Sequence, residues 1–268
     1  MIEIATFGLF LTLCYMIYLY RSGSLKNKSI LEKYQQMKDR LNSQKTITGD
    51  VPYNGVFEVH ITIDPCDNYV KLVDYVTKSK THAMKLVFAV SNAKNNQYML
   101  SYFTRKEDDM DVYKGTQIVA NELKQYGIIV NRIKVEGHGL QNTPMTKHDY
   151  ELSKKYLAEK YTTGSPYFEF HVKINDSSGL NNIESDIEMY EGTGLSYNLC
   201  SASRKPILTI RIYNEGFIGA QLYKDNIMNS LKNNHGYSFE DKIQQEYCIY
   251  DSNTDLDAKW LNETSKSN

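Results

Sequence analysis

The sequence predicts an α+β protein in which two ferredoxin-like halves, each of the order β-α-β-β-α-β and each with an antiparallel sheet, follow an N-terminal transmembrane helix. Three observations lead to this fold class. Residues 4–20 are an unbroken apolar run, two later segments share the string F-E-x-H-x-x-I, and similar elements follow each of them. Alternation with a period of two is typical of half-buried strands, and its recurrence predicts an internal duplication.

The apolar run at 4–20 contains no charged residue and no proline. As a helix it would be roughly 25 Å long, close to the ~30 Å hydrocarbon core of a bilayer. Glu3 precedes the run, whereas Arg21, Lys26 and Lys28 follow it, so the positive-inside rule places the rest of the chain in the cytoplasm. We therefore expect a single-pass membrane protein that contacts the lipid bilayer through residues 4–20.

The two halves and their flanking segments divide the chain into six parts. The expected parts are a transmembrane anchor at 1–24, a juxtamembrane stalk at 25–50, a first half at 51–143, a linking helix at 144–164, a second half at 165–262 and a polar tail at 263–268. The two helices of such a half cover one face of its sheet. The polar face of each F-E-x-H strand is then left for solvent, a ligand or the other half.

Charge and cysteine content exclude several classes of function. The 31 basic and 32 acidic residues nearly cancel, so the chain has no strong nucleic-acid footprint. The four cysteines are far apart and form no C-x-x-C pair, which argues against a disulfide framework and a zinc site. We expect no metal and no cofactor.

The polar faces of the two matching strands carry the candidate catalytic residues. His60 and Thr62 place an imidazole and a hydroxyl on one face, about 7 Å apart, and His171 and Lys173 occupy the matching positions of the second strand. Two facing histidines could act as general acid and base, while the hydroxyl and the ammonium group bind phosphate oxygens. The remaining candidate ligand-binding residues, on the same strands and their neighbours, are Glu58, Glu169, Arg132, Lys134 and Arg211.

These strands resemble the paired H-x-[ST] strands of the 2H phosphoesterases. His60 and Thr62 match the first motif and His171 matches the second, but Lys173 stands where the second hydroxyl belongs. The resemblance covers only the two strands. It implies hydrolysis of 2′,3′-cyclic phosphates or 2′-5′ nucleotide linkages.

Two non-catalytic alternatives compete with this hypothesis. In one, the acidic and histidine side chains of the two strands pair with the basic residues of neighbouring strands and hold the halves together. In the other, the polar faces bind a phosphate-bearing small molecule, such as a nucleotide, without turnover. We favour a membrane-anchored domain that binds a protein partner or a phosphate ligand, with the phosphoesterase as the alternative.

Two further segments have simpler interpretations. The run from Asp251 to Asp257 has the oxygen spacing that opens an EF-hand loop, but it lacks the required glycine and glutamate, so we interpret it as a polar turn. Gly137, His138 and Gly139 are interpreted as a flexible link after a strand.

The whole chain also resembles an uncharacterised protein family of giant, mimivirus-type DNA viruses and some cellular genomes. The paired F-E-x-H strands and the closing run from Glu246 to Trp260 carry this resemblance. It implies a viral protein, whose membrane would be that of the host cell or the virion, and no particular activity.

Overall fold

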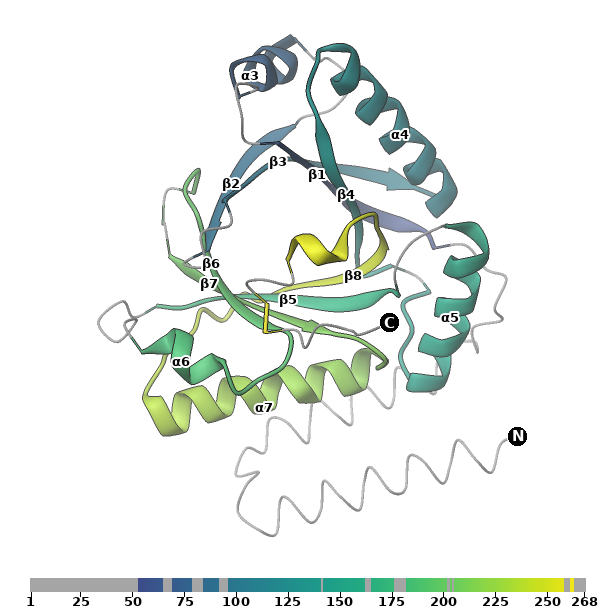
Figure 1. Cartoon of the computed structure of the whole chain (residues 1–268). Helices are drawn as coiled ribbons and strands as arrows, with labels where there is room; N and C mark the ends of the chain where they lie inside the picture. The colour runs from purple at the N-terminus through teal and green to yellow at the C-terminus, as the bar shows by residue number, and fades with distance from the viewer. Residues whose placement is uncertain are drawn as a thin grey trace. The chain divides into compact units, whose positions relative to one another are not determined.

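In the part of the chain that the structure describes, eight antiparallel strands close into a single barrel (Figure 1). The computed structural model describes residues 53–64, 69–78, 84–91, 96–140, 142–161, 165–175, 182–201, 203, 205–257 and 261–262. The strands are β1 (Gly55–Ile63), β2 (Lys85–Ser91), β3 (Asn96–Lys106), β4 (Val130–His138), β5 (Tyr167–Lys173), β6 (Thr193–Asn198), β7 (Pro206–Ile212) and β8 (Gln244–Asp251). Their order around the barrel is β1-β3-β2-β6-β7-β5-β8-β4.

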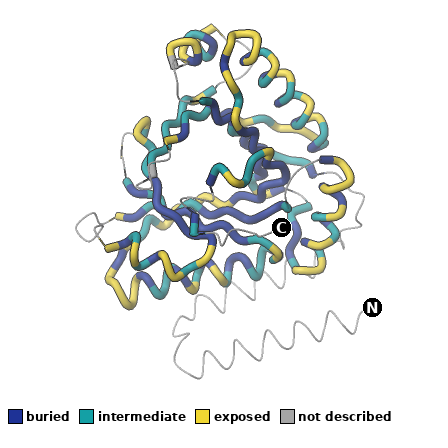
Figure 2. Tube along the Cα trace, viewed as in Figure 1, coloured by how far each residue is buried: buried dark blue, intermediate teal, exposed yellow. Residues whose placement is uncertain are grey.

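Helices cover the outside of the barrel. They are α3 (Tyr69–Lys78), α4 (Asp109–Gln125), α5 (Lys147–Lys160), α6 (Ile183–Ile187) and α7 (Phe217–His235), and a short 3-10 helix, η1 (Thr254–Leu256), follows the last strand. Helix α4 lies against β1, β3 and β4, while α7 lies against β5. Figure 2 shows strands that are largely buried and helices whose outer sides are exposed.

The alternation seen in the sequence separates the apolar core from the lumen. On β1, Phe57, Val59 and Ile61 are fully buried, and on β5 Phe170 and Val172 are fully buried as well. These side chains belong to the apolar core, which also includes the buried stripe of the covering helices. Since successive strand residues point to opposite faces, the polar residues between them point into the barrel.

Local signals fix the helix ends. Asp108 caps α4, because its side chain accepts a hydrogen bond from the backbone NH of Met110. Thr146 and Asp149 form a capping box at the start of α5, the helix that connects the two halves. Helix α5 lies within the range 144–164 that was predicted for the linking helix.

The prediction of two separate ferredoxin-like sheets was wrong. Strand β2 pairs with β6 and β4 pairs with β8, both antiparallel, so the eight strands form one closed sheet. An open four-stranded sheet leaves unpaired backbone NH and C=O groups along both edges, and closure of the barrel pairs them. Alternation along a strand is the same in an open sheet and in a barrel, so the pattern could not distinguish the two folds.

The predicted membrane anchor is also corrected. Among the residues that the structure describes, no helix is both long and apolar enough to cross a bilayer. This finding contradicts the transmembrane helix and the single-pass location. The segment at 4–20 and the stalk at 25–50 lie outside the described residues. The prediction rested on the hydropathy of one segment, and hydropathy alone does not distinguish an anchor from another apolar helix.

Candidate functional site

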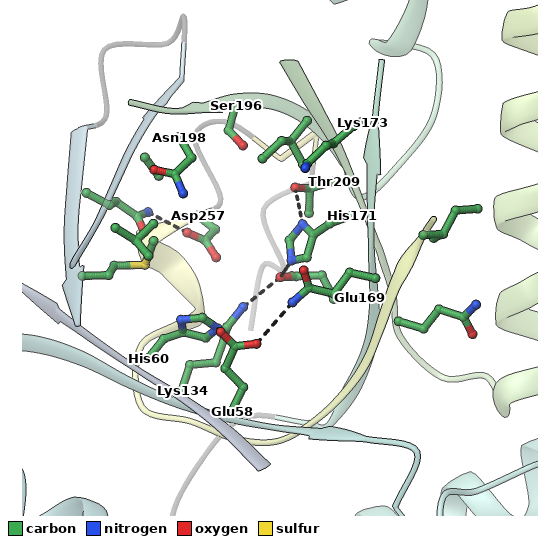
Figure 3. A pocket seen from close by; sticks show the side chains of 18 of the residues that line it. Glu58, His60, Lys134, Glu169, His171, Lys173, Ser196, Asn198, Thr209 and Asp257 are labelled. Atoms are coloured by element: carbon green, nitrogen blue, oxygen red, sulfur yellow. Dashed lines mark hydrogen bonds and ion pairs between the residues drawn. The ribbon is translucent and has the colours of Figure 1, made fainter. Parts of the chain in front are cut away.

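The barrel lumen contains a cavity of about 700 Å³. Seven of the nine sequence-predicted site residues line it, most of them labelled in Figure 3. They are Glu58, His60, Arg132, Lys134, Glu169, His171 and Lys173. Thr62 and Arg211 do not line the cavity but are buried in the same barrel. The structure therefore brings the polar faces of the two F-E-x-H strands together.

The cavity has one apolar wall and one charged wall. Val87 and Ala89 of β2, Met99 and Phe103 of β3 and Ile207 of β7 contribute apolar surface. The charged residues come mainly from β1, β4 and β5, with Gln244 of β8 beside them. Ser196, Asn198 and Thr209 add neutral polar groups on β6 and β7 (Figure 3).

A cluster of four glutamates and three histidines forms the floor of the charged wall. Register places Glu136 of β4 opposite Glu58 and Glu246 of β8 opposite Glu169. The strand pairs β1–β4 and β5–β8 thus each contribute two glutamates to the barrel. We call Glu58, His60, Glu136, His138, Glu169, His171 and Glu246 the Glu/His cluster.

Each imidazole of the Glu/His cluster lies between two carboxylates. His60 Nε2 is 3.0 Å from Glu136 and 3.7 Å from Glu58. His171 Nε2 is 3.2 Å from Glu169 and 3.3 Å from Glu246. His138 Nε2 is 3.0 Å from Glu58 and 3.4 Å from Glu246.

These carboxylates determine the protonation of two histidines. Burial by itself would lower the pKa of His171, but the adjacent carboxylates of Glu169 and Glu246 outweigh burial and raise the pKa to about 10. The pKa of His138 is raised in the same way, because burial is outweighed by its contacts with Glu58 and Glu246. Both imidazoles are therefore positively charged at neutral pH when only protons are available.

Lys134 connects strands β4 and β5 through two ion pairs. Its Nζ lies 2.6 Å from Glu136 of the same strand and 2.8 Å from Glu169 of β5. Burial lowers the pKa of Lys134, but the two carboxylates outweigh it and hold the pKa above its usual range. This lysine is thus a fixed positive charge with two anionic partners.

A second network closes one end of the barrel. Asp257, which directly follows η1, accepts hydrogen bonds from Arg132 (2.6 Å), Arg211 (2.5 Å) and Gln97 (2.7 Å). Asp251 accepts two more from Arg132, at 2.8 and 2.5 Å. We call Arg132, Arg211, Asp251 and Asp257 the arginine network; it ties the C-terminal turn to both halves.

Five buried or partly buried acidic and histidine residues of the barrel were not among the site residues predicted from the sequence, namely Glu136, His138, Glu246, Asp251 and Asp257. A signal existed for two of them, because Glu136-Gly-His138 is a third E-x-H string on a strand. Strand β4 continues to His138, so the interpretation of this segment as a flexible link was wrong. The interpretation of 251–257 as a polar turn was incomplete. Asp257 is 2% exposed and accepts the hydrogen bonds of the arginine network.

No family model and no curated protein sequence matches the chain. Two solved structures show distant similarity. One is chlorite dismutase from Candidatus Nitrospira defluvii in complex with imidazole, at 10% identity over 77% of this chain and 94% of that chain, with a TM-score of 0.25. The other is the siroheme decarboxylase NirDL in co-complex with an iron-uroporphyrin III analogue, at 8% identity over 81% and 80%, with a TM-score of 0.25. Similarity at this level carries no argument about function.

The chemistry available to the lumen follows from its side chains. His60 and His171 are near enough to one cavity to exchange protons with a molecule bound in it. Among the described residues, the groups of side chains that could ligate a metal ion all fall within the Glu/His cluster.

Proposed function

We propose that this protein is a small-molecule-binding module whose ligand occupies the barrel lumen. The observation that carries the proposal is the cavity of about 700 Å³ with its apolar and charged walls on different strands. Ligand sites commonly have volumes of about 300–1,000 Å³, with an apolar lining and a few convergent polar groups. The ligand's apolar body lies against Val87, Met99 and Phe103, and its polar head points to the charged wall.

The charges around the cavity favour a head group that donates hydrogen bonds or carries positive charge. Arg132, Lys134 and Arg211 each lie within 2.8 Å of two carboxylates. A phosphate would have to compete with these buried carboxylates, and separating a buried ion pair costs about 3–5 kcal/mol. Lys173 is less engaged, with its Nζ 3.9 Å from Glu240 and its side chain 42% exposed.

A matched pair of probes tests both the cavity and the head group. Phenethylamine and phenyl phosphate share an aromatic body but carry opposite charges, and their binding can be measured by isothermal titration calorimetry. We expect phenethylamine to bind more tightly. Ala89→Phe should weaken binding at least about tenfold by filling the cavity, whereas Ala158→Phe on the exposed side of α5 should not.

Two results would count against the proposal. If Ala89→Phe binds phenethylamine as tightly as the unaltered protein does, the lumen is not the binding site. Tighter binding of phenyl phosphate would reverse the head-group assignment and support the phosphate ligand expected from the sequence.

Phosphoesterase activity is the second candidate, and one observation favours it. His60 and His171 line the same cavity, with side chains 15% and 26% exposed, as an acid–base pair requires. Thr209 Oγ1 lies 3.1 Å from His171 Nδ1 and supplies a hydroxyl near the position that Lys173 leaves without one.

Hydrolysis of 2′,3′-cyclic AMP tests this second candidate directly. General acid–base catalysis predicts that His60→Ala and His171→Ala each lower turnover by ~10²-fold or more. Circular dichroism of both variants must show an intact fold. Absence of turnover in the unaltered protein leaves the binding module as the function.

A further inference from the structure

We propose that the Glu/His cluster binds a divalent transition-metal ion, with Glu246 as the ligand shared by every arrangement. Metal binding goes beyond the small-molecule binding proposed above and does not depend on it. The argument rests on ligand geometry, on buried oxygens without hydrogen bonds and on the charge of the lumen.

Three overlapping groups in the cluster have the geometry of a metal site. They are Glu58–His138–Glu246, His60–Glu136–Glu246 and Glu169–His171–Glu246, and in each group the ligand atoms lie within 4.8 Å of one another. Imidazole nitrogen and carboxylate oxygen bind such ions at about 2.0–2.2 Å, so two ligands of one ion are up to roughly 4 Å apart. Side-chain movements of under about 1 Å would therefore complete the coordination.

Buried atoms of the same cluster lack hydrogen bonds. Both carboxylate oxygens of Glu136, Oε2 of Glu246 and Nδ1 of His60 receive or make none. The Glu136 side chain is fully buried, and the nearby Lys134 and His60 reach ion-pair distance without hydrogen-bond geometry. Buried polar atoms are nearly always hydrogen-bonded, whereas these carboxylate oxygens have only ion-pair contacts. Their lone pairs are therefore available to a metal ion.

The lumen has more carboxylates than permanent cations. In the described part of the barrel, six carboxylates are buried, those of Glu58, Glu136, Glu169, Glu246, Asp251 and Asp257. They face three permanent cations, those of Arg132, Lys134 and Arg211. The arginine network balances its own two aspartates, which leaves the four glutamates of the Glu/His cluster with Lys134 and the imidazoles. A divalent ion that took the place of two imidazole protons would keep the charge of the cluster unchanged.

The donor set indicates the class of metal. Imidazole nitrogens and carboxylate oxygens without a thiolate suit Mn²⁺, Fe²⁺ or Zn²⁺ better than Cu⁺, which prefers sulfur ligands. Five of the seven cluster residues line the cavity, so open coordination positions would face a bound small molecule. The two oxygens of Glu246 allow it to bridge two ions, which limits the expected stoichiometry to one or two per chain.

Metal titration of the full chain tests the proposal. Protein stripped with EDTA is titrated with Mn²⁺, and free Mn²⁺ is measured by electron paramagnetic resonance; Zn²⁺ retained after gel filtration is measured by elemental analysis. We expect one or two ions per chain. Loss of a residue that binds the ion directly should lower metal affinity at least as much as loss of a residue that only orients a ligand. Glu246→Gln should therefore weaken Mn²⁺ binding by about 100-fold or more. Glu215→Gln, the same substitution on the exposed surface, should bind as the unaltered protein does.

A second variant and a second readout keep the test decisive if Glu246→Gln does not fold. His138→Gln removes a partly exposed ligand and should also weaken binding, and Mn²⁺ should raise the Tm of the unaltered protein. Absence of binding by the unaltered protein, or equal binding by folded Glu246→Gln, overturns the metal site. Ala89→Phe separates the two proposals, because it should lose phenethylamine and retain Mn²⁺.

Discussion

Asp257→Asn should destabilise the barrel strongly, although Asp257 belongs to a short turn near the end of the described chain. The Asp257 carboxylate is 2% exposed and accepts hydrogen bonds from Arg132, Arg211 and Gln97 at 2.5–2.7 Å. Asparagine has nearly the same volume but removes the negative charge. Each guanidinium then keeps one anionic partner and loses the other in a site shielded from water.

The expected cost follows from the burial of this network. Breaking a buried ion pair by changing one partner typically costs about 3–5 kcal/mol, and the remaining partners of both arginines favour the lower end. A loss of ~3 kcal/mol lowers the Tm of a domain of this size by about 6–12 °C. Urea unfolding followed by far-UV circular dichroism measures the change in the free energy of unfolding.

Asp255→Asn is the matched control, because Asp255 lies two residues earlier in the same turn and is exposed. An exposed substitution of this kind should change stability by less than about 0.5 kcal/mol. If Asp257→Asn unfolds within ~1 kcal/mol of Asp255→Asn, the arginine network does not hold the barrel together and the reasoning fails.

Three further predictions concern acid stability, a buried carboxylate and a glycine. Burial raises the pKa of Asp257, but the two arginines outweigh burial and lower it, so its contribution to stability is present above about pH 4 and is lost as pH falls. The difference in urea midpoint between Asp257→Asn and the unaltered protein should therefore shrink below about pH 4; a constant difference would contradict this. Asp109→Ala removes the acceptor of three buried hydrogen bonds, which are donated by the backbone NH of Tyr53 and the hydroxyls of Tyr156 and Tyr161. It should lower the free energy of unfolding in urea by ~2–4 kcal/mol, whereas Asp111→Ala at an exposed position should change it little. Gly192→Ala places a Cβ 2.2 Å from a backbone carbonyl oxygen, whereas Gly236→Ala, with a similar positive φ, meets no atom within 4 Å. Gly236→Ala should lower the free energy of unfolding by about 1 kcal/mol, and Gly192→Ala should lower it clearly more. Equal Tm values for the two variants would show that the close contact at Gly192 relaxes freely.

The local structure of the described chain could be predicted from the sequence because its causes are local. Period-two alternation on β1 and β5 follows from one apolar and one polar face, and Thr146 with Asp149 marks the start of α5. The same alternation correctly assigned Glu58 and His60 to a polar strand face. It also identified seven of the residues that line the cavity, since residues two apart on a strand share a face.

Closure of the barrel was decided only by the tertiary structure. Pairing of β2 with β6 and of β4 with β8 joins strands that are distant in sequence, and it depends on the relative position of whole sheets. The alternation within each strand is unchanged by that pairing. An open pair of ferredoxin-like sheets therefore fitted the sequence as well as the barrel did.

Partners of the predicted site residues were decided in the same way. Lys134 meets Glu169 and Arg132 meets Asp257, although 35 and 125 residues separate them. The sequence by itself determined which side chains share a polar strand face. Only closure of the barrel determined that these faces meet in one lumen, because contacts between distant strands depend on long-range register, which local periodicity does not encode.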